Sequence, residues 1–358
     1  MKFRRFIYSF VSVLIAFVVM NAVVWHCWTE KIFSPAYGDG GDLSRLGYLP
    51  SFKLQRKNHF DLPRRHISLR EYSGQPVDLL TVGDSFSNGG GGGKNRYYQD
   101  YIATLNQMTV LNVGMFKQEG TRPFLDPVQT LLILINSGEF DRIAPKAVLL
   151  SVSVKQSDLL AHPMDLSRTA PVEKVRDIGS YEYYEGSPAA DGNPFSFIST
   201  GNLQYLYWTG LRYLAGKTNK SVALAPLNRK LFTVQDDTLL YYRNDVKHIP
   251  RINKEALEQI NDNLNQVAEL LAKRGVKLYF MPCVDKYDLY SPYIANNKQP
   301  KNSFFDIFRQ LPKQYTFIDT KEILSEKVAQ GVRDIYYSDE THWSWKASAS
   351  IFEKVRFK

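Results

Sequence analysis

Two short segments, far apart in the sequence, carry the residue types that nucleophilic catalysis needs. The first is an apolar run, residues 77–82, that ends abruptly in Gly83-Asp84-Ser85. An apolar run that breaks into Gly and small polar residues is typical of a buried strand followed by a tight turn. Such a turn would hold Ser85 at the carboxyl end of a sheet, where open α/β folds bind their ligands.

A serine is a weak nucleophile unless a base lies within hydrogen-bond reach. The segment 336–343 supplies His342, and an imidazole with an unperturbed pKa of about 6.5 can take the hydroxyl proton near neutrality. A carboxylate beside the ring would hold it in the correct tautomer. Asp339, three residues before the histidine, is the favoured acid, and Glu340, two residues before it, is the alternative.

These two segments resemble the first and last blocks of the SGNH (GDSL-type) hydrolases, through Gly83-Asp84-Ser85 and Asp339-x-x-His342. Trp343 makes the chain resemble the alginate O-acetyltransferase branch of polysaccharide-modifying proteins, whose motif is Asp-x-His-Trp. The loop Pro282-Cys283-Val284-Asp285-Lys286-Tyr287-Asp288-Leu289-Tyr290 is similar to the Pro-x-Lys-x-x-x-Tyr loop of that branch. The order of the motifs differs, because the alginate enzymes carry Asp-x-His ahead of the nucleophile.

The resemblance, which extends over residues 77–350, implies a flavodoxin-like three-layer fold. It also implies O-acetyl (acyl) transfer to a cell-surface or exported polysaccharide through an acyl-enzyme, with a membrane-bound O-acyltransferase as a partner. If water instead of a sugar hydroxyl resolved the intermediate, the same residues would make an acetylesterase of acylated carbohydrate. A third alternative is a non-catalytic polysaccharide-binding or assembly protein on a degenerate SGNH scaffold.

The resemblance also assigns residues around the nucleophile. The backbone amides of Ser85 and Gly114 are the expected oxyanion donors, and Gln156 or Ser153 could replace a third donor, an Asn that this family carries after its third strand. The expected substrate-binding residues are Lys286, Tyr287, Tyr290 and Trp343. No metal or cofactor is expected, since the remaining histidines lack metal-ligand spacing.

Five consecutive glycines, residues 89–93, follow the nucleophile. They do not match a phosphate-binding loop of the Walker type, because Asn88 stands where its first Gly is needed and Lys94 is followed by Asn95. We expect a flexible rim beside Ser85.

Alternating apolar runs and amphipathic segments predict an α/β fold in which a parallel sheet is covered on both faces. The expected strands are residues 77–82, 109–113, 147–154, 276–281 and 316–318, and the expected helices are 97–107, 126–136, 254–274, 319–330 and 345–355. Residues 155–252 would form a large insertion after the third strand, as a cap or groove wall.

The amino-terminal segment predicts an uncleaved membrane anchor, with a cleaved signal peptide as the alternative. Residues 1–29 combine Lys2, Arg4 and Arg5 with an apolar run long enough to span a bilayer, so the amino end would be cytoplasmic and the rest exported. Residues 30–76 would be a linker and extended arm, followed by an SGNH-like catalytic domain, residues 77–358. The net charge of +9 is spread out and no nucleic-acid-binding motif occurs, so nucleic acid is not an expected partner.

Overall fold

The architecture was obtained from a computed structural model of the 358-residue chain. The structure describes residues 2–33, 41–49, 58, 61–114, 126–170, 175 and 197–358. Parts of the expected linker and of the expected insertion therefore lie outside the described residues, namely 34–40, 50–57, 59–60, 171–174 and 176–196.

A six-stranded sheet, parallel at every pairing, forms the centre of the molecule in the order β1-β3-β2-β4-β7-β8. The expected five strands are all present, as β2 (Leu79–Gly83), β3 (Val110–Asn112), β4 (Ala147–Ser153), β7 (Lys277–Cys283) and β8 (Thr316–Phe317). Every residue of β2, β3 and β4 is buried, as a parallel sheet covered on both faces requires. The order reverses between β2 and β4, so the turn after β2 lies where doubly wound sheets open a crevice.

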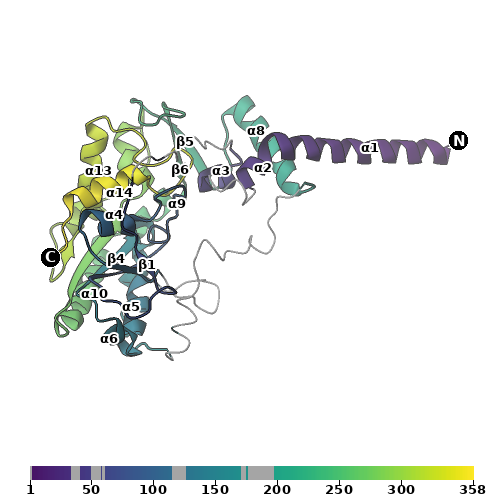
Figure 1. Ribbon diagram of the computed structural model, residues 1–358. Helices are drawn as coiled ribbons and strands as arrows, with labels where there is room; N and C mark the ends of the chain where they lie inside the picture. The colour runs from purple at the N-terminus through teal and green to yellow at the C-terminus, as the bar shows by residue number, and fades with distance from the viewer. Residues whose placement is uncertain are drawn as a thin grey trace.

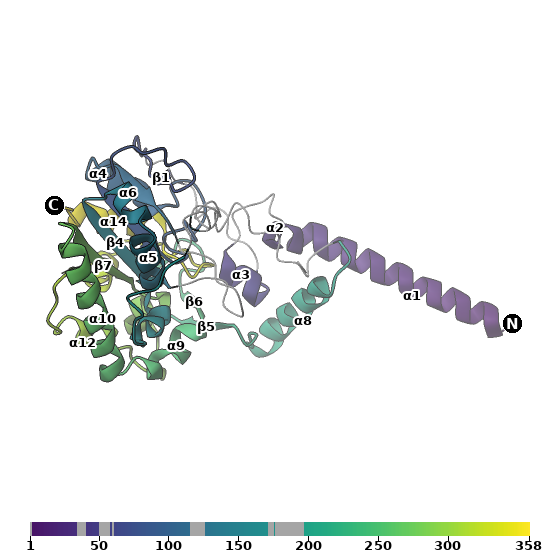
Figure 2. The same ribbon diagram turned by 90° about the horizontal axis from the view of Figure 1, so that it is seen from below.

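Helices cover both faces of this sheet, and the five expected helices are confirmed. On one side α4, α13 and α14 lie together, and on the other α5, α6 and α10 (Figures 1 and 2). Their bounds are α4 (Tyr98–Leu105), α5 (Pro127–Asn136), α6 (Glu139–Ile143), α10 (Lys254–Ala272), α13 (Thr320–Ala329) and α14 (Trp345–Lys354). Two short helices, α11 (Lys286–Tyr290) and α12 (Phe304–Phe308), join β7 to β8.

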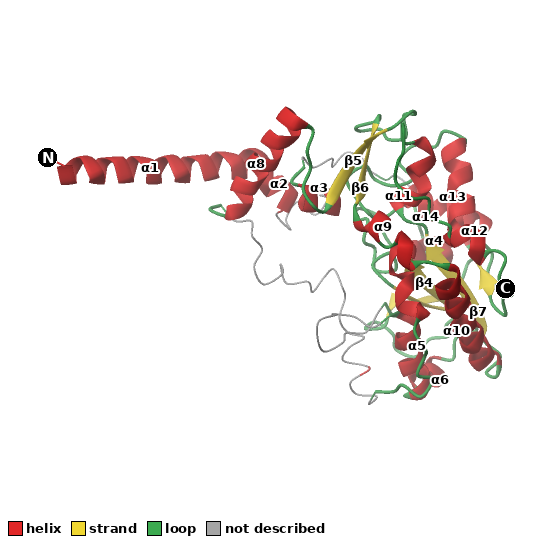
Figure 3. Ribbon diagram, turned by 180° about the vertical axis from the view of Figure 1, so that it is seen from behind, coloured by secondary structure: helices red, strands yellow, loops and turns green. Residues whose placement is uncertain are grey.

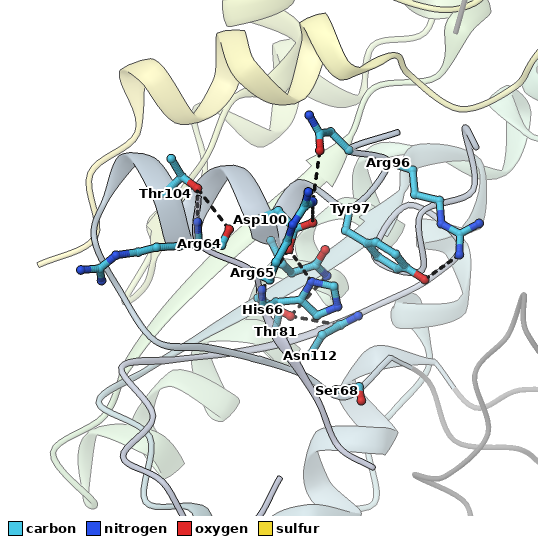
Figure 4. A network of polar contacts seen from close by, with 12 residues as sticks. Arg64, Arg65, His66, Ser68, Thr81, Arg96, Tyr97, Asp100, Thr104 and Asn112 are labelled. Carbon is cyan, nitrogen blue, oxygen red and sulfur yellow. Dashed lines mark hydrogen bonds and ion pairs between the residues drawn. The ribbon is translucent and has the colours of Figure 1, made fainter. Parts of the chain in front are cut away.

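The sixth strand, β1 (Ile67–Ser68), comes from the segment expected to be an extended arm, and it pairs with β3 at the sheet edge. Polar contacts clamp this segment to α4 (Figure 4). Asp100 accepts hydrogen bonds from Arg65 Nη1 at 2.8 Å and from the His66 backbone N–H at 2.9 Å. The arm is thus partly built into the sheet.

Within the expected insertion, the described residues form a 3₁₀ helix and a small helical and antiparallel unit. They comprise η4 (Val154–Ala161), α8 (Thr200–Ala215), the hairpin β5 (Val222–Pro226) and β6 (Thr238–Tyr242), α9 (Asn244–Lys247) and η5 (Ile249–Arg251). Figure 3 shows the hairpin and α8 between the main sheet and the amino-terminal helix.

The amino-terminal helix α1 (Lys2–Val24) continues through a π-helical turn, η1 (Trp25–Thr29), into α2 (Glu30–Phe33). Residues 3–29 are long and apolar enough to cross a membrane, and most of their side chains are exposed. After residues outside the described part, the short helix α3 (Asp42–Gly47) lies against the β5–β6 hairpin.

Candidate functional site

The turn after β2 is fixed by a buried carboxylate. Asp84 Oδ1 accepts the N–H of Phe86 at 3.1 Å, and its Oδ2 accepts the N–H of Ser153, at the end of β4, at 2.6 Å. A Cβ on Gly83 would overlap Ser151 Oγ, so only glycine lets β2 and β4 approach this closely. The turn therefore presents the partly buried Ser85 at the carboxyl edge of the sheet.

A second polar cluster holds this turn from the side of β3. Asn112 Oδ1 accepts the hydroxyls of Ser87 at 2.9 Å and Thr81 at 3.0 Å, while its Nδ2 donates to Ser87 O at 3.0 Å. Gln99 of α4 also donates to Ser87 O, at 2.9 Å. The side chains that make these hydrogen bonds are buried, so the backbone that carries Ser85 is rigidly supported.

Ser85 and His342 meet, although 257 positions separate them. Ser85 Oγ lies 2.7 Å from His342 Nε2, and His342 Nδ1 lies 2.7 Å from Glu340 Oε1. Because an ionised carboxylate can only accept, Nδ1 carries the hydrogen and Nε2 is left to accept from the serine hydroxyl. This arrangement can move the Ser85 proton to the imidazole while the carboxylate stabilises the resulting charge.

The acid beside the imidazole is Glu340, not the favoured Asp339. The chain turns at residues 338–339 and bends at residues 341–342, and this path brings the Glu340 side chain back to the ring of His342. Asp339 instead faces α3, where its Oδ2 accepts the N–H of Gly41 at 3.2 Å and its carbonyl accepts that of Leu43 at 3.0 Å. The preference for Asp339 was therefore wrong in this geometry, and the alternative has the required contact.

A second carboxylate, which the sequence analysis missed, lies on the same side of the imidazole. Asp42, the first residue of α3, has its Oδ2 3.9 Å from His342 Nδ1 and its backbone N–H donates to Glu340 Oε2 at 3.0 Å. The N–H of Thr341 donates to Asp42 Oδ1 at 2.8 Å, and the Thr341 hydroxyl also bonds to this carboxylate. Local sequence held no signal for this role, since an acidic residue in a first helical turn is common anywhere.

Asp42, Glu340 and His342 offer ligand-type atoms that all lie within 4.8 Å of one another, the kind of set that can hold a cation. Both carboxylates, however, already accept N–H groups from Asp42 and Thr341, and Glu340 also accepts that of the imidazole. We therefore interpret the three side chains as one hydrogen-bonded network.

Electrostatics around the imidazole favour its protonated form. Burial alone lowers the pKa of His342, but the hydrogen bond and charge of Glu340, together with the charge of Asp42, outweigh it and leave that pKa above its usual value. Burial, then the charge of Glu340, raises the pKa of Asp42 to about 6. The imidazole is thus a stronger base than a free histidine.

The glycine-rich segment packs directly on the imidazole. A Cβ on Gly90 would lie 2.5 Å from His342 Nε2, and one on Gly91 would lie 2.7 Å from Trp343 O. The N–H of Gly90 also donates to Ser85 O at 2.9 Å. The glycines are needed here because the backbone passes too close to the ring for any side chain.

Of the expected oxyanion donors, Gly114 lies at the end of β3 with φ +68°, a conformation suited to glycine. The carboxamide of Asn88 lies against it, with Oδ1 2.8 Å from where a Cβ would stand. Gln156 is exposed on η4, and the Ser153 N–H is occupied by Asp84. The buried Ser153 hydroxyl has no hydrogen-bond partner among the described residues.

The four expected substrate-binding residues are buried, and this expectation is corrected. Lys286 Nζ donates to the carbonyls of Tyr337 and Ser338, both at 2.8 Å, and burial lowers its pKa to about 7. The other three are also in the core: Tyr287 donates to Pro300 O, Tyr290 accepts the N–H of Tyr336, and Trp343 packs edge-on against Phe86. Lys286 and Tyr290 thereby hold the loop that carries His342.

Buried charges lie on the other side of the turn. Lys155, just after β4, has its Nζ 3.4 Å from Asp245 Oδ1, and its charge acts to lower the pKa of His342. Asp285 is fully buried 3.5 Å from His248 Nε2, and burial raises its pKa well above the usual range. Neither the pair of Lys155 with Asp245 nor that of Asp285 with His248 is among the expected site residues.

Comparison with known proteins adds no relative at the level of sequence: no protein-family model matches this chain, and neither does any curated protein.

Proposed function

We propose that the chain is a serine-dependent acyltransferase that moves an acetyl or similar acyl group onto a hydroxyl of an exported polysaccharide. The observation that carries this proposal is the unbroken chain of two 2.7 Å contacts from Ser85 Oγ through His342 to Glu340. A serine used only to stabilise a turn would not need a buried histidine and carboxylate aligned behind its hydroxyl.

In this mechanism Ser85 Oγ attacks the acyl carbonyl of the donor while its proton passes to His342 Nε2. The tetrahedral intermediate then collapses, the bond to the leaving oxygen breaks, and His342 returns the proton to that oxygen. In the second half, an acceptor hydroxyl gives its proton to His342 Nε2 and attacks the acyl carbon of the Ser85 ester. The bond from that carbon to Ser85 Oγ then breaks, and His342 gives the proton to Oγ, which restores the serine hydroxyl. Glu340 holds Nδ1–H throughout and stabilises the imidazolium formed in each half.

The negative charge of each tetrahedral intermediate needs donors beside Ser85. We propose the backbone N–H groups of Ser85 and Gly114 for this role, with the Asn88 carboxamide as a candidate third donor because it lies against Gly114. Loss of one such donor typically costs about 3–4 kcal/mol of transition-state stabilisation.

The topology supports an SGNH-like fold. Numbered from β2, the main strands lie in the order second, first, third, fourth, fifth, which is the order of flavodoxin-like sheets. The resemblance of the two terminal motifs to the alginate O-acetyltransferase branch is the basis for naming an acetyl group and a polysaccharide. A membrane-bound acyltransferase would be the natural donor for a site attached to an amino-terminal membrane helix on the periplasmic or extracytoplasmic side.

The first experiment tests the chemistry. The full chain in detergent should release nitrophenol from nitrophenyl acetate, and Ser85→Ala should reduce this turnover to the level of buffer. The matched control is Ser291→Ala, a serine in the 3₁₀ turn Ser291–Tyr293, which should leave the rate unchanged. Equal rates for wild type and Ser85→Ala would refute the enzyme and leave a non-catalytic polysaccharide-binding protein.

A second experiment divides transfer from hydrolysis. Acetylated product is measured by mass spectrometry after an oligosaccharide acceptor is added to the acetyl ester. Transfer predicts acetylated sugar at the expense of free acetate, whereas an acetylesterase would form acetate alone whatever the acceptor concentration.

A further inference from the structure

Helix α8 carries an apolar stripe that faces outward. Its residues Leu203, Leu206, Tyr207, Tyr213 and Leu214 recur at the three- and four-residue spacing of one helical face. All five are exposed, and Tyr213 and Leu214 are 89% and 82% accessible. A soluble helix would turn such a stripe toward the core, so an apolar partner is expected on this face.

The start of α8 is attached to the end of the membrane-type helix through Asn202, beside the stripe. Asn202 Oδ1 accepts the hydroxyl of Thr29 at 2.7 Å, and its Nδ2 donates to Asn21 Oδ1 at 3.1 Å. Asn21 also accepts the N–H of Ser199 at 3.2 Å. Asn21 is the only residue with an amide side chain in the sequence 3–24, and these hydrogen bonds satisfy it. A polar side chain needs such partners when it is surrounded by lipid tails.

The depth of this contact along α1 is informative. Residues 3–29 form a helix of 27 residues, whereas about 20 residues span the hydrocarbon core of a bilayer. Counting about 20 residues from Phe6, the first residue after Arg4 and Arg5, puts the far boundary of that core near Trp25, between Asn21 and Thr29. The start of α8 therefore meets α1 at the level where lipid tails give way to headgroups.

Orientation and charge agree with this depth. In Figures 1 and 3 α8 crosses the end of α1, and in Figure 2 the two helices point in different directions, so α8 does not run alongside α1. Residues 197–220 contain Arg212, Lys217 and Lys220 and no acidic residue. Trp28, exposed on η1, stacks on Tyr205 of α8 and adds an aromatic group of the kind enriched at membrane interfaces.

We propose that α8 is a membrane-surface helix, which lies in the bilayer interface with its stripe of Leu203, Leu206, Tyr207, Tyr213 and Leu214 in the acyl region. With α1 across the membrane, a helix of 16 residues, about 24 Å long, lies parallel to the surface and fixes the orientation of the α/β domain above it. The occupant of the stripe is lipid, and the basic residues favour anionic headgroups.

The test uses the full chain in vesicles of phosphatidylcholine and phosphatidylglycerol, with Cys27→Ser to remove the exposed cysteine; Cys283 is buried. An environment-sensitive fluorophore is attached at Tyr213→Cys and, in separate proteins, at Ile15→Cys within α1 and at Gln266→Cys on the exposed face of α10. Quenching by lipids that carry a spin label in the acyl chain, and by aqueous iodide, is measured for each.

We expect lipid quenching at Tyr213→Cys and Ile15→Cys, each at least threefold above that at Gln266→Cys, and iodide quenching at Gln266→Cys alone. Iodide quenching at Tyr213→Cys with Ile15→Cys in lipid would overturn the surface-helix proposal while α1 spans the bilayer. Protection of Tyr213→Cys from both quenchers would overturn it in favour of a protein on the stripe. Iodide quenching at Ile15→Cys would remove its premise, and with it the proposal.

Discussion

Replacing Gly90 by alanine tests whether the glycine-rich segment sets the position of the imidazole. The added Cβ would lie 2.5 Å from His342 Nε2, about 1 Å closer than the 3.5 Å optimum for non-bonded heavy atoms. Because the φ of Gly90 is not in the left-handed region, alanine is compatible with the backbone, and the ring or the segment must give way instead.

We expect Gly90→Ala to reduce the turnover rate more than the stability of the fold. A displacement of about 1 Å would break the 2.7 Å contact between Ser85 Oγ and His342 Nε2, and a misplacement of about that size can reduce turnover by about 10²-fold. That factor corresponds to about 2.7 kcal/mol of transition-state free energy. The folded state should lose far less, because the core beneath the turn is untouched.

The assay combines kcat/KM for nitrophenyl acetate with the midpoint of thermal unfolding. The matched control is Gly210→Ala in α8, where nothing lies within 4 Å of the new Cβ and the rate should be unchanged. Wild-type kcat/KM in Gly90→Ala would refute the reasoning, because the segment could then not be packed against the imidazole. An equal loss of rate in Gly210→Ala would also refute it.

Three further outcomes are expected. Glu340→Gln should reduce kcat by about 10²–10⁴-fold, since the acid that orients the base is lost, while Asp339→Asn should cost less than about tenfold; the reverse order would restore Asp339 as the acid. His342 must be neutral to accept a proton and its pKa is raised, so kcat/KM should fall with decreasing pH around a midpoint above 6.5; Asp42→Asn removes a charge that raises that pKa and should move the midpoint to lower pH, and a shift upward would contradict this. Lys286→Met leaves two buried loop carbonyls without their donor and should lower the free energy of unfolding by about 2–5 kcal/mol in urea, an effect that an exposed lysine would not give.

The parts of the fold that follow from local pattern were predictable. Continuous apolar runs bounded by turns gave the five main strands, and the three- to four-residue spacing of apolar side chains gave the helices. β1 was not predictable, because two partly buried residues, Ile67 and Ser68, carry no periodicity. Its place depends on the distant carboxylate of Asp100, which only the folded chain brings into contact.

The same distinction applies to the site. Ser85 and His342 could be predicted because each lies in a recognisable motif, Gly83-Asp84-Ser85 and Asp339-x-x-His342, and the two motifs occur in the expected order. The choice between Asp339 and Glu340 depended on whether the backbone before His342 is extended or turned, which their side chains do not reveal. Asp42 could not be found, since it approaches the imidazole from a segment 300 positions away in sequence.

Helix α11 (Lys286–Tyr290) is buried, although its residue types suggest an exposed segment. A lysine flanked by tyrosines reads as an exposed binding loop, because lysine is almost never fully buried unless it is paired. Here two backbone carbonyls pair it, and both belong to the turn that the distant bridge between Tyr336 and Trp343 closes.

The hydrogen bond from the Gly41 N–H to Asp339 connects the sheet edge that carries Ser85 and His342 to the chain just after α2. Gly41 follows Phe33, the last residue of α2, by eight positions, and eight extended residues reach at most about 28 Å. If α1 is embedded in a bilayer, this short connection keeps Ser85 close to the membrane surface. A shortened chain that begins after residue 49 would lose this connection and, with it, Asp42.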